Sequence, residues 1–289
     1  MPTINSINNT NNNQPSTGKK IAYAAAGTVI GWEAEPFIRR GIQYPIRKLI
    51  KFPDSTLQNV ELREYIDKAL PKADSKFKFL DVNENNAEQI KNELRIKPRK
   101  DSTLTKIKNH ILRRPNNSKE FFTEVLEGRN AGYNTKLNRV MCNVDKFGVA
   151  AFHELAHYKN YHSKNPITIA LCTLRQFTYG GTLGIAAVTM LKNPPKENDN
   201  KLYIDNFIKE NCGTLTAAAI LPLTLEETLA NIKGYKLAKD VGVTGEKLAK
   251  VKTACQKSAA LYWGGLVTCV LALKAASKVR DIIAAQGEK

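Results

Sequence analysis

Three residues in one short segment have the types and spacing needed for metal chemistry. His153 and His157 are four residues apart, and Glu154 directly follows the first histidine. In a helix, residues four apart project from one face, so the two imidazoles could share one tetrahedral Zn²⁺ with room for a third ligand and a water. Glu154 would take a proton from that water. The alternative is a surface helix that carries this pattern by coincidence, but two of the chain's four histidines fall in it.

A third ligand is expected from the pair Glu226-Glu227, which follows an apolar stretch at 213–225. Glu227 and Asn231 are four apart, so a carboxylate at Glu227 could complete a His₂Glu site. Asn231 would then accept a hydrogen bond from the second ring nitrogen of a ligand histidine. Spacing alone leaves two alternatives open. Glu226 could be the ligand, or both glutamates could simply favour the start of a helix, which the segment resembles.

Two short strands are expected just before the metal helix, at 130–133 and 139–144, with the turn between them at 134–138. The metal helix itself is expected over 146–160. In zinc peptidases, a strand beside the metal helix often binds the substrate backbone by strand addition. The hairpin lies at the right place in the sequence for that task.

The remainder of the chain is predicted to be mainly helical. The region from Glu33 to about Arg114 is basic and mostly helical in pattern. A helix over 35–50 has an apolar and a basic side and is expected to be interrupted or kinked near Pro45. This helix would suit either an anionic lipid surface or an ordinary core. We expect a mainly α fold with a small β-hairpin or sheet beside the metal helix. The predicted regions are a disordered Asn-rich tail at 1–18, a basic helical region at 19–120 with an apolar anchor or core helix at 21–32, a metal-binding core at 121–240 that includes apolar helices at 167–191 and 213–225, and a helical region at 241–289.

The net charge of +17 suits nucleic acid, an anionic membrane surface, or the cytoplasmic part of a membrane protein. Aromatic and basic residues do not interleave in a nucleic-acid-binding pattern, so we expect no nucleic-acid partner. The apolar stretches at 167–191, 213–225 and 258–273 are each interrupted or shorter than the about 20 residues of a normal span. Arg175, within the first, is tolerable only near an interface or inside the protein. A basic region at 33–164 before a neutral loop at 192–211 nevertheless favours membrane association with a cytoplasmic catalytic side.

The order of these motifs resembles the membrane zinc peptidases that include HtpX and the CaaX prenyl-protein endopeptidases. The resemblance covers about residues 130–238 and is carried by three pieces of sequence. These are Asn130-Ala131-x-Tyr133, His153-Glu154-Leu155-Ala156-His157-Tyr158-Lys159-Asn160, which is similar to H-E-L-x-H-x-x-N, and Glu227-x-x-Ala230-Asn231-x-x-Gly234, which is similar to E-x-x-A-D-x-x-G. It favours Glu227 over Glu226 as the ligand. Asn231 departs from the family's Asp and brings no negative charge.

The resemblance implies a zincin-like core with helices in or on a membrane, and a zinc-dependent endopeptidase that acts on membrane-associated or misfolded protein. His153, His157 and Glu227 would hold the zinc, and Glu154 would be the general base. A donor to the oxyanion is also needed, and Tyr158, His162 and Tyr235 are candidates by their place in the sequence alone. The alternative is a catalytically impaired metal-binding protein, or a basic interaction protein at a membrane surface, an interpretation that Asn231 supports.

Overall fold

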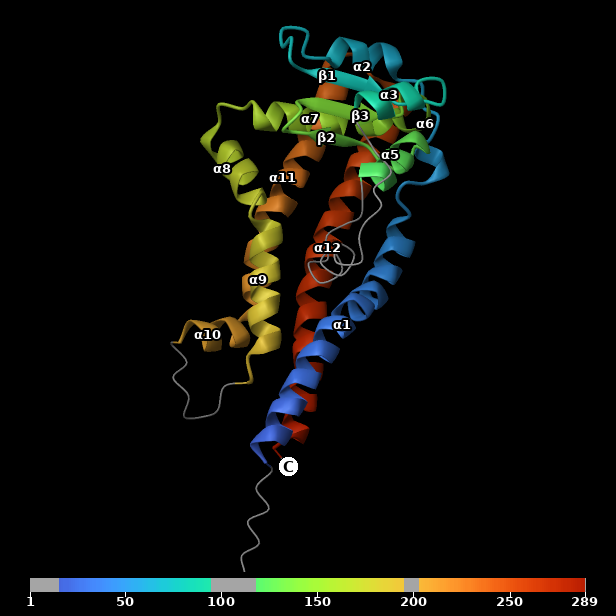
Figure 1. Ribbon diagram of the computed structural model, residues 1–289. Helices are drawn as coiled ribbons and strands as arrows, with labels where there is room; N and C mark the ends of the chain where they lie inside the picture. Colours follow the sequence, from blue (N-terminus) through green and yellow to red (C-terminus); the bar gives the residue numbers. More distant parts are fainter. Residues whose placement is uncertain (1–15, 95–117, 195–202, 289) are drawn as a thin grey trace, which may run out of the picture. The chain divides into compact units, whose positions relative to one another are not determined.

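The computed structural model describes residues 16–94, 118–194 and 203–288, which are mainly helical with one three-stranded sheet (Figure 1). The chain forms two units built from separate segments. The first unit comprises Met1–Gly41, Gly184–Leu215 and Cys269–Lys289, and the second comprises Ile42–Leu183 and Thr216–Thr268. The helices are α1 (Thr17–Ile50), α2 (Arg63–Ala69), α3 (Ala87–Glu93), α5 (Ser118–Leu126), α6 (Val144–Phe147), α7 (Ala151–Tyr161), α8 (Pro166–Arg175), α9 (Thr178–Leu191), α10 (Ile204–Glu210), α11 (Cys212–Asp240) and α12 (Gly245–Gln286), with 3₁₀ turns η1 (Ser55–Leu57) and η2 (Gly148–Ala150).

The sheet lies in the second unit and has the order β1-β3-β2, from β1 (Lys78–Asp81), β3 (Arg139–Cys142) and β2 (Gly132–Asn134). β2 and β3 are antiparallel, with Tyr133 opposite Val140, which confirms the predicted hairpin. β1 pairs in parallel with β3. The region from Glu33 to Arg114, expected to be mostly helical, thus also contains a short strand that the sequence did not indicate. This strand has four residues and no clean alternation of burial, so its pairing with a distant partner decides its conformation.

The core of the second unit packs α7 against the sheet and against α11 and α12. Phe152 and Leu155 of α7 are buried with Val140 of β3, Leu237 of α11 and Val251 of α12. Burial of these apolar side chains fixes which face of α7 turns inward. The opposite side of the same turns carries the two histidines.

Two helix boundaries differ from the sequence predictions. The metal helix expected at 146–160 is divided into α6, η2 and α7, because the backbone leaves the helical region at Phe147 (φ −143°, ψ 38°). Helix α11 starts at Cys212 and continues through Pro222, so Glu226 and Glu227 lie in its middle. The alternative in which these glutamates favour a helix N-terminus is therefore wrong.

The first unit is a set of helices around Met190, Cys212, Leu273 and Ala276. Lys209 is buried there and lies 2.7 Å from the carboxylate of Asp281. Helix α1 runs from Thr17 to Ile50 through Pro45, so of the interruption or kink expected there, the interruption is not formed. The expected anchor at 21–32 is the beginning of this helix. The tail is described only from residue 16, and its predicted disorder at 1–15 lies outside the described residues.

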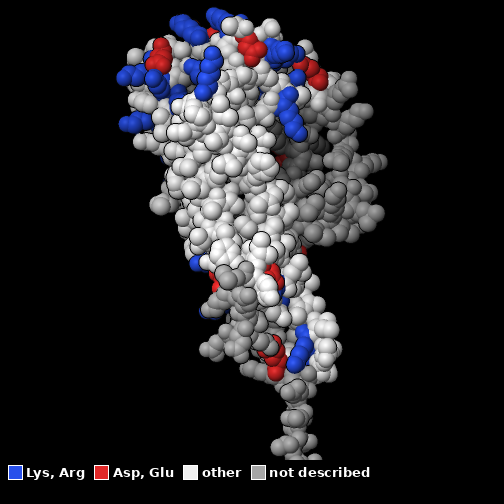
Figure 2. All heavy atoms as spheres, turned by 90° about the vertical axis from the view of Figure 1, so that its left-hand side faces the viewer, with Lys and Arg blue, Asp and Glu red and all other residues white. Residues whose placement is uncertain are grey.

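Among the described residues, α12 is the helix long and apolar enough to cross a membrane. The second unit also exposes apolar side chains on α8, on the turn that follows it and at the start of α9. These are Ile167, Ile169, Leu174, Phe177 and Tyr179. On the face shown in Figure 2, the Lys and Arg side chains of this unit gather at its sheet-bearing end, and the surface below them is largely uncharged.

Candidate metal centre

Helices α7 and α11 approach closely at the histidines because α11 carries a glycine there. A Cβ atom on Gly234 would lie 2.9 Å from the carbonyl oxygen of Phe152 and 3.0 Å from the Cα of His153. These are backbone atoms that cannot move aside, so any larger residue would push the helices apart. Ala230, one turn earlier, is fully buried. The small residues of the Glu227-x-x-Ala230-Asn231-x-x-Gly234 segment thus bring Glu227 within reach of α7.

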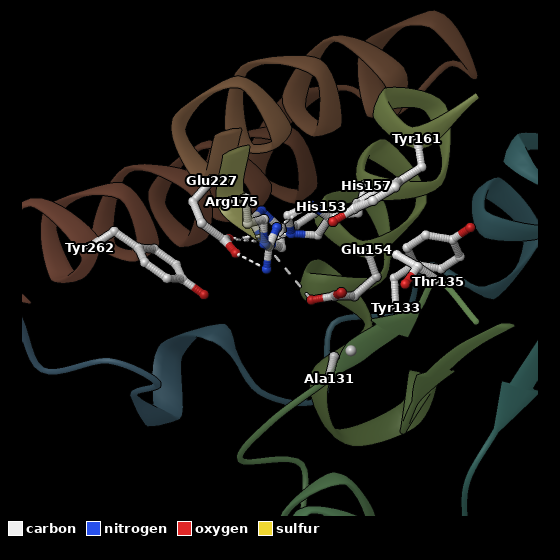
Figure 3. A pocket seen from close by; sticks show the side chains of 11 residues that line it. Ala131, Tyr133, Thr135, His153, Glu154, His157, Tyr161, Arg175, Glu227 and Tyr262 are labelled. Atoms are coloured by element: carbon white, nitrogen blue, oxygen red, sulfur yellow. Dashed lines mark hydrogen bonds and ion pairs between the residues drawn. The ribbon is translucent and has the colours of Figure 1, made fainter. Parts of the chain in front are cut away.

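Three side-chain atoms form a tight triangle on these two helices (Figure 3). The Nε2 atoms of His153 and His157 are 3.0 Å apart, and Glu227 Oε2 is 3.2 Å from the first and 3.3 Å from the second. Zn²⁺ binds such atoms at about 2.0–2.2 Å, which separates tetrahedral ligands by about 3.3–3.5 Å. The three predicted ligands therefore lie within about 0.3 Å of the spacing that one zinc ion requires. Glu226 does not belong to this triangle.

The charges around the triangle also favour a divalent cation. Glu154, Glu226 and Glu227 bring three negative charges, and Arg175 contacts two of these carboxylates with one positive charge. Three negative charges and one positive charge leave two uncompensated negative charges in a largely buried site, which is costly. A Zn²⁺ ion would cancel them. The residues present therefore fit a zinc ion in ligand type, spacing and charge.

The buried charges also shift the pKa values of side chains at the site. Burial alone would lower the pKa of His157, but its contacts with Glu226 and Glu227 outweigh burial and raise the pKa to about 10. Burial would raise the pKa of Glu227, yet hydrogen bonds to His153 and His157 hold it well below its usual value. Both shifts come from the concentration of negative charge at this site, an environment that favours a cation.

Glu226 supplies the contact that we had assigned to Asn231. Its Oε1 lies 2.9 Å from Nδ1 of His157 and also accepts from Asn160 Nδ2 at 2.9 Å. A proton on Nδ1 that is donated to Glu226 leaves the Nε2 lone pair free for a metal. Glu226 is fully buried. It orients the ligand histidine with a full negative charge, which an asparagine could not provide.

Asn231 is bonded along its own helix instead. Its Nδ2 donates to the carbonyl oxygen of Glu227, one turn earlier, at 2.9 Å. Within the described part of the chain, the buried Oδ1 of Asn231 and the buried Nδ1 of His153 have no hydrogen-bond partner. The predicted hydrogen bond from a ligand histidine to Asn231 is therefore not formed. The amide of asparagine can donate to the preceding turn, an interaction that a carboxylate could not make.

Arg175 fixes the two glutamates, a role that sequence analysis did not assign. It lies at the end of α8, which starts at Pro166 after Asn165 has capped the helix by accepting from two backbone N–H groups. Its Nη1 contacts Glu226 Oε2, and its Nη2 lies 2.7 Å from Glu227 Oε1. Arg175 thus occupies one oxygen of Glu227 and leaves the other facing the histidines. Its place inside an apolar stretch was the signal available in the sequence.

A small pocket opens beside the triangle, and its lining combines α7, α8, α11 and α12 with the strand β2 (Figure 3). The lining residues are Ala131, Gly132, Tyr133, Thr135, His153, Glu154, His157, Tyr161, Arg175, Glu227 and Tyr262. The carboxylate of Glu154 points into this pocket, with Oε1 3.9 Å from His153 Nε2. Glu154 therefore stands next to the ligands without belonging to them, as a general base requires.

The three residues considered earlier as oxyanion donors do not line this pocket. Tyr158 donates to Asp74 at 3.0 Å, and Nδ1 of His162 lies 2.9 Å from the carbonyl oxygen of Tyr158. Tyr235 packs against the hydrophobic core. The tyrosines in the lining are Tyr133, Tyr161 and Tyr262. Tyr161 follows His157 by four residues, a helical spacing that could have indicated it.

The role of Glu226 can be tested by Glu226→Gln. Glutamine keeps an oxygen that can accept from His157 but loses the charge that makes the imidazole more basic and pairs with Arg175. We expect zinc affinity to fall about 10–100-fold, measured by competition with a chromophoric chelator. Glu246→Gln, at an exposed ion pair with Lys250, is the matched control and should leave the affinity unchanged. Equal affinities in both variants would contradict the assigned role.

Comparisons of this chain with protein-family models, with curated proteins and with solved structures found no match, so the residues and geometry of the site carry the functional argument.

Proposed function

We propose that this chain is a zinc-dependent endopeptidase whose metal is held by His153, His157 and Glu227. The observation that carries the proposal is the triangle of Nε2, Nε2 and Oε2 atoms with the free carboxylate of Glu154 beside it. Three protein ligands with one open position are typical of catalytic zinc rather than structural zinc. The resemblance of the two motifs to membrane zinc peptidases supports the same conclusion.

When bound, zinc supplies a Lewis acid that polarises the carbonyl and lowers the pKa of water to about 7. Glu154 takes one proton from the attacking water as the water oxygen forms a bond to the carbonyl carbon and an electron pair moves to the carbonyl oxygen. When the C–N bond breaks, its electron pair goes to nitrogen. Glu154 then returns the proton to that nitrogen, and the amine leaves. Glu226 and Arg175 hold the ligands in position throughout.

Strand β2 offers a place for the substrate backbone. It lies at an edge of the sheet within the described part of the chain, and Ala131, Gly132 and Tyr133 also line the pocket. An edge strand presents unpaired backbone N–H and C=O groups, to which an extended peptide can add as a further strand. A protein or peptide substrate bound in this way would pass its backbone across the open side of the site.

We also propose that the peptidase is membrane-associated, with its catalytic part on the cytoplasmic side. The length and apolar character of α12 support association with lipid, as do the exposed apolar side chains of α8 and α9. Substrates would then be membrane-associated or misfolded proteins. The alternative is a metal-binding protein without activity. The charged acceptor at Glu226 weakens that alternative, because the histidine does not depend on Asn231 for its orientation.

The experiment is cleavage of unfolded casein by the full chain, purified from the membrane fraction in mild detergent. We expect cleavage that stops with 1,10-phenanthroline and returns when stoichiometric zinc is added. We also expect the chain to remain with membranes after carbonate washing. Cleavage that persists after zinc removal would contradict a zinc mechanism. A protein that binds zinc but cuts no substrate would support the inactive alternative, and a chain found only in the soluble fraction would contradict membrane association.

A further inference from the structure

The site needs a hydrogen-bond donor for the negative charge that develops on the carbonyl oxygen during hydrolysis. Three tyrosines line the pocket, and their surroundings differ. Tyr133 is already committed, because its hydroxyl donates to Asn138 Oδ1 at 2.9 Å. The charged groups acting on Tyr161 are Arg175, Glu226 and Glu227, and Glu154 is not among them. Those acting on Tyr262 are Glu227, Glu154 and Arg175, so Tyr262 is the one of these two tyrosines that lies close enough to interact with the base.

The Tyr262 hydroxyl also points in the right direction. In Figure 3 the ring projects from the side of the pocket opposite Tyr161 and Tyr133, with its oxygen directed toward the space between Glu227 and Glu154. Glu154 activates the water that attacks the carbonyl carbon. A carbonyl group bound beside Glu227 for this attack would have its oxygen in this space. The hydroxyl therefore faces the reacting atoms rather than the supporting groups.

Contacts between α11 and α12 hold Tyr262 in this position. Trp263 donates its indole N–H to the hydroxyl of Thr228 at 3.2 Å, which joins the residues that directly follow Tyr262 and Glu227. One turn earlier on α12, Ser258 lies 3.5 Å from Nδ2 of Asn231. These two contacts, one on each side of Tyr262 along the chain, fix the register of α12 against α11. Asn231 thus takes part in aligning α12 with α11.

We propose that Tyr262 is a catalytic residue that donates a hydrogen bond to the oxyanion, an inference that rests on the proposed peptidase function. The hydroxyl keeps its proton throughout, so no bond of the tyrosine is made or broken. The hydroxyl hydrogen-bonds Glu227, the third ligand, so it lies next to the position where the carbonyl oxygen would bind and can exchange this contact for one with the oxyanion. Glu227 keeps Arg175 and the two histidines as neighbours when the hydroxyl turns to the substrate. Helix α12 lies outside the stretch that resembles known peptidases, and sequence analysis gave it no chemistry.

The test is Tyr262→Phe beside Tyr161→Phe, in the full chain, with a peptide taken from a casein cleavage site. Loss of one oxyanion donor is expected to lower kcat of Tyr262→Phe about 10²–10³-fold, with KM nearly unchanged. Tyr161→Phe, which removes a hydroxyl from the same pocket, should stay within about tenfold of wild type. Both variants should bind one zinc, because neither tyrosine belongs to the ligand triangle.

A second measurement does not depend on turnover. A phosphinic peptide carries a tetrahedral anion in place of the scissile amide, so its affinity should fall in Tyr262→Phe by a factor similar to that in kcat/KM. Equal kcat and equal affinity in Tyr262→Phe and wild type would overturn the inference while leaving the peptidase intact. A large loss in Tyr161→Phe alone would overturn it in favour of Tyr161. A wild type that binds zinc and cuts no substrate would remove the peptidase function, and this inference with it.

Discussion

Glu154→Gln is expected to bind one zinc ion and to lose nearly all peptidase activity. Glutamine preserves the shape of the side chain and cannot accept the proton of the attacking water. General-base catalysis contributes about 10²–10⁴-fold, and kcat for a casein-derived peptide should fall by this factor. Zinc should stay, because Glu154 Oε1 lies 3.9 Å from the nearest ligand nitrogen and outside the ligand triangle. Kinetics and elemental analysis on the same preparation give both results.

The matched control for this variant is Glu88→Gln, which makes the same chemical change on an exposed glutamate paired with Lys91. It should leave both zinc content and kcat unchanged. A Glu154→Gln protein that cuts at the wild-type rate would show that another group takes the proton. A protein that lost its zinc instead would place Glu154 among the ligands, against the geometry.

The second large effect is expected from removal of a ligand. His157→Ala and Glu227→Ala should each lose stoichiometric zinc on purification. Zinc affinity should fall by more than the about 10–100-fold expected when Glu226, which contacts a ligand and not the metal, is changed. The reason is that the triangle of Nε2, Nε2 and Oε2 atoms loses one corner, and two ligands do not define a catalytic zinc site. Zinc per chain, measured by elemental analysis, reports this directly.

His162→Ala is the control for these variants. His162 follows α7 and is exposed, and it contacts the ring and the backbone oxygen of Tyr158 rather than any zinc ligand. It should retain about one zinc per chain. Circular dichroism should show that all three variants keep the helical content of wild type, so that a loss of zinc is not a loss of fold. Full zinc occupancy in Glu227→Ala would contradict its place as the third ligand.

The sequence was sufficient for the parts of the site that depend on local spacing. His153 and His157 share a helix face wherever the helix lies, and the hairpin of β2 and β3 follows from two short strands around a turn. The choice between Glu226 and Glu227 was harder. The two side chains leave the helix about 100° apart, and both reach the histidines from α11. Glu227 faces Nε2 of His157 and Glu226 faces Nδ1 of the same ring, a difference that the residue order alone could not predict.

The features that the sequence did not predict correctly depend on contacts between residues far apart in the chain. Strand β1 forms because it pairs with β3, about sixty residues later in the chain. Asn231 was expected to imitate an aspartate, but its amide donates to its own helix and leaves that place to Glu226. Tyr262 reaches the pocket only because α12 packs beside α11. No spacing within the sequence connects it with the histidines.

The most direct test of the account is the zinc content of the wild-type chain, purified in detergent without added metal and without chelators. We predict about one zinc per chain, released by 1,10-phenanthroline and restored by one equivalent of zinc. A chain that contains no zinc, and takes up none when zinc is supplied, would contradict the account. The histidines and glutamates of α7 and α11 would then be a buried network of charged side chains, and the H-E-x-x-H pattern a coincidence.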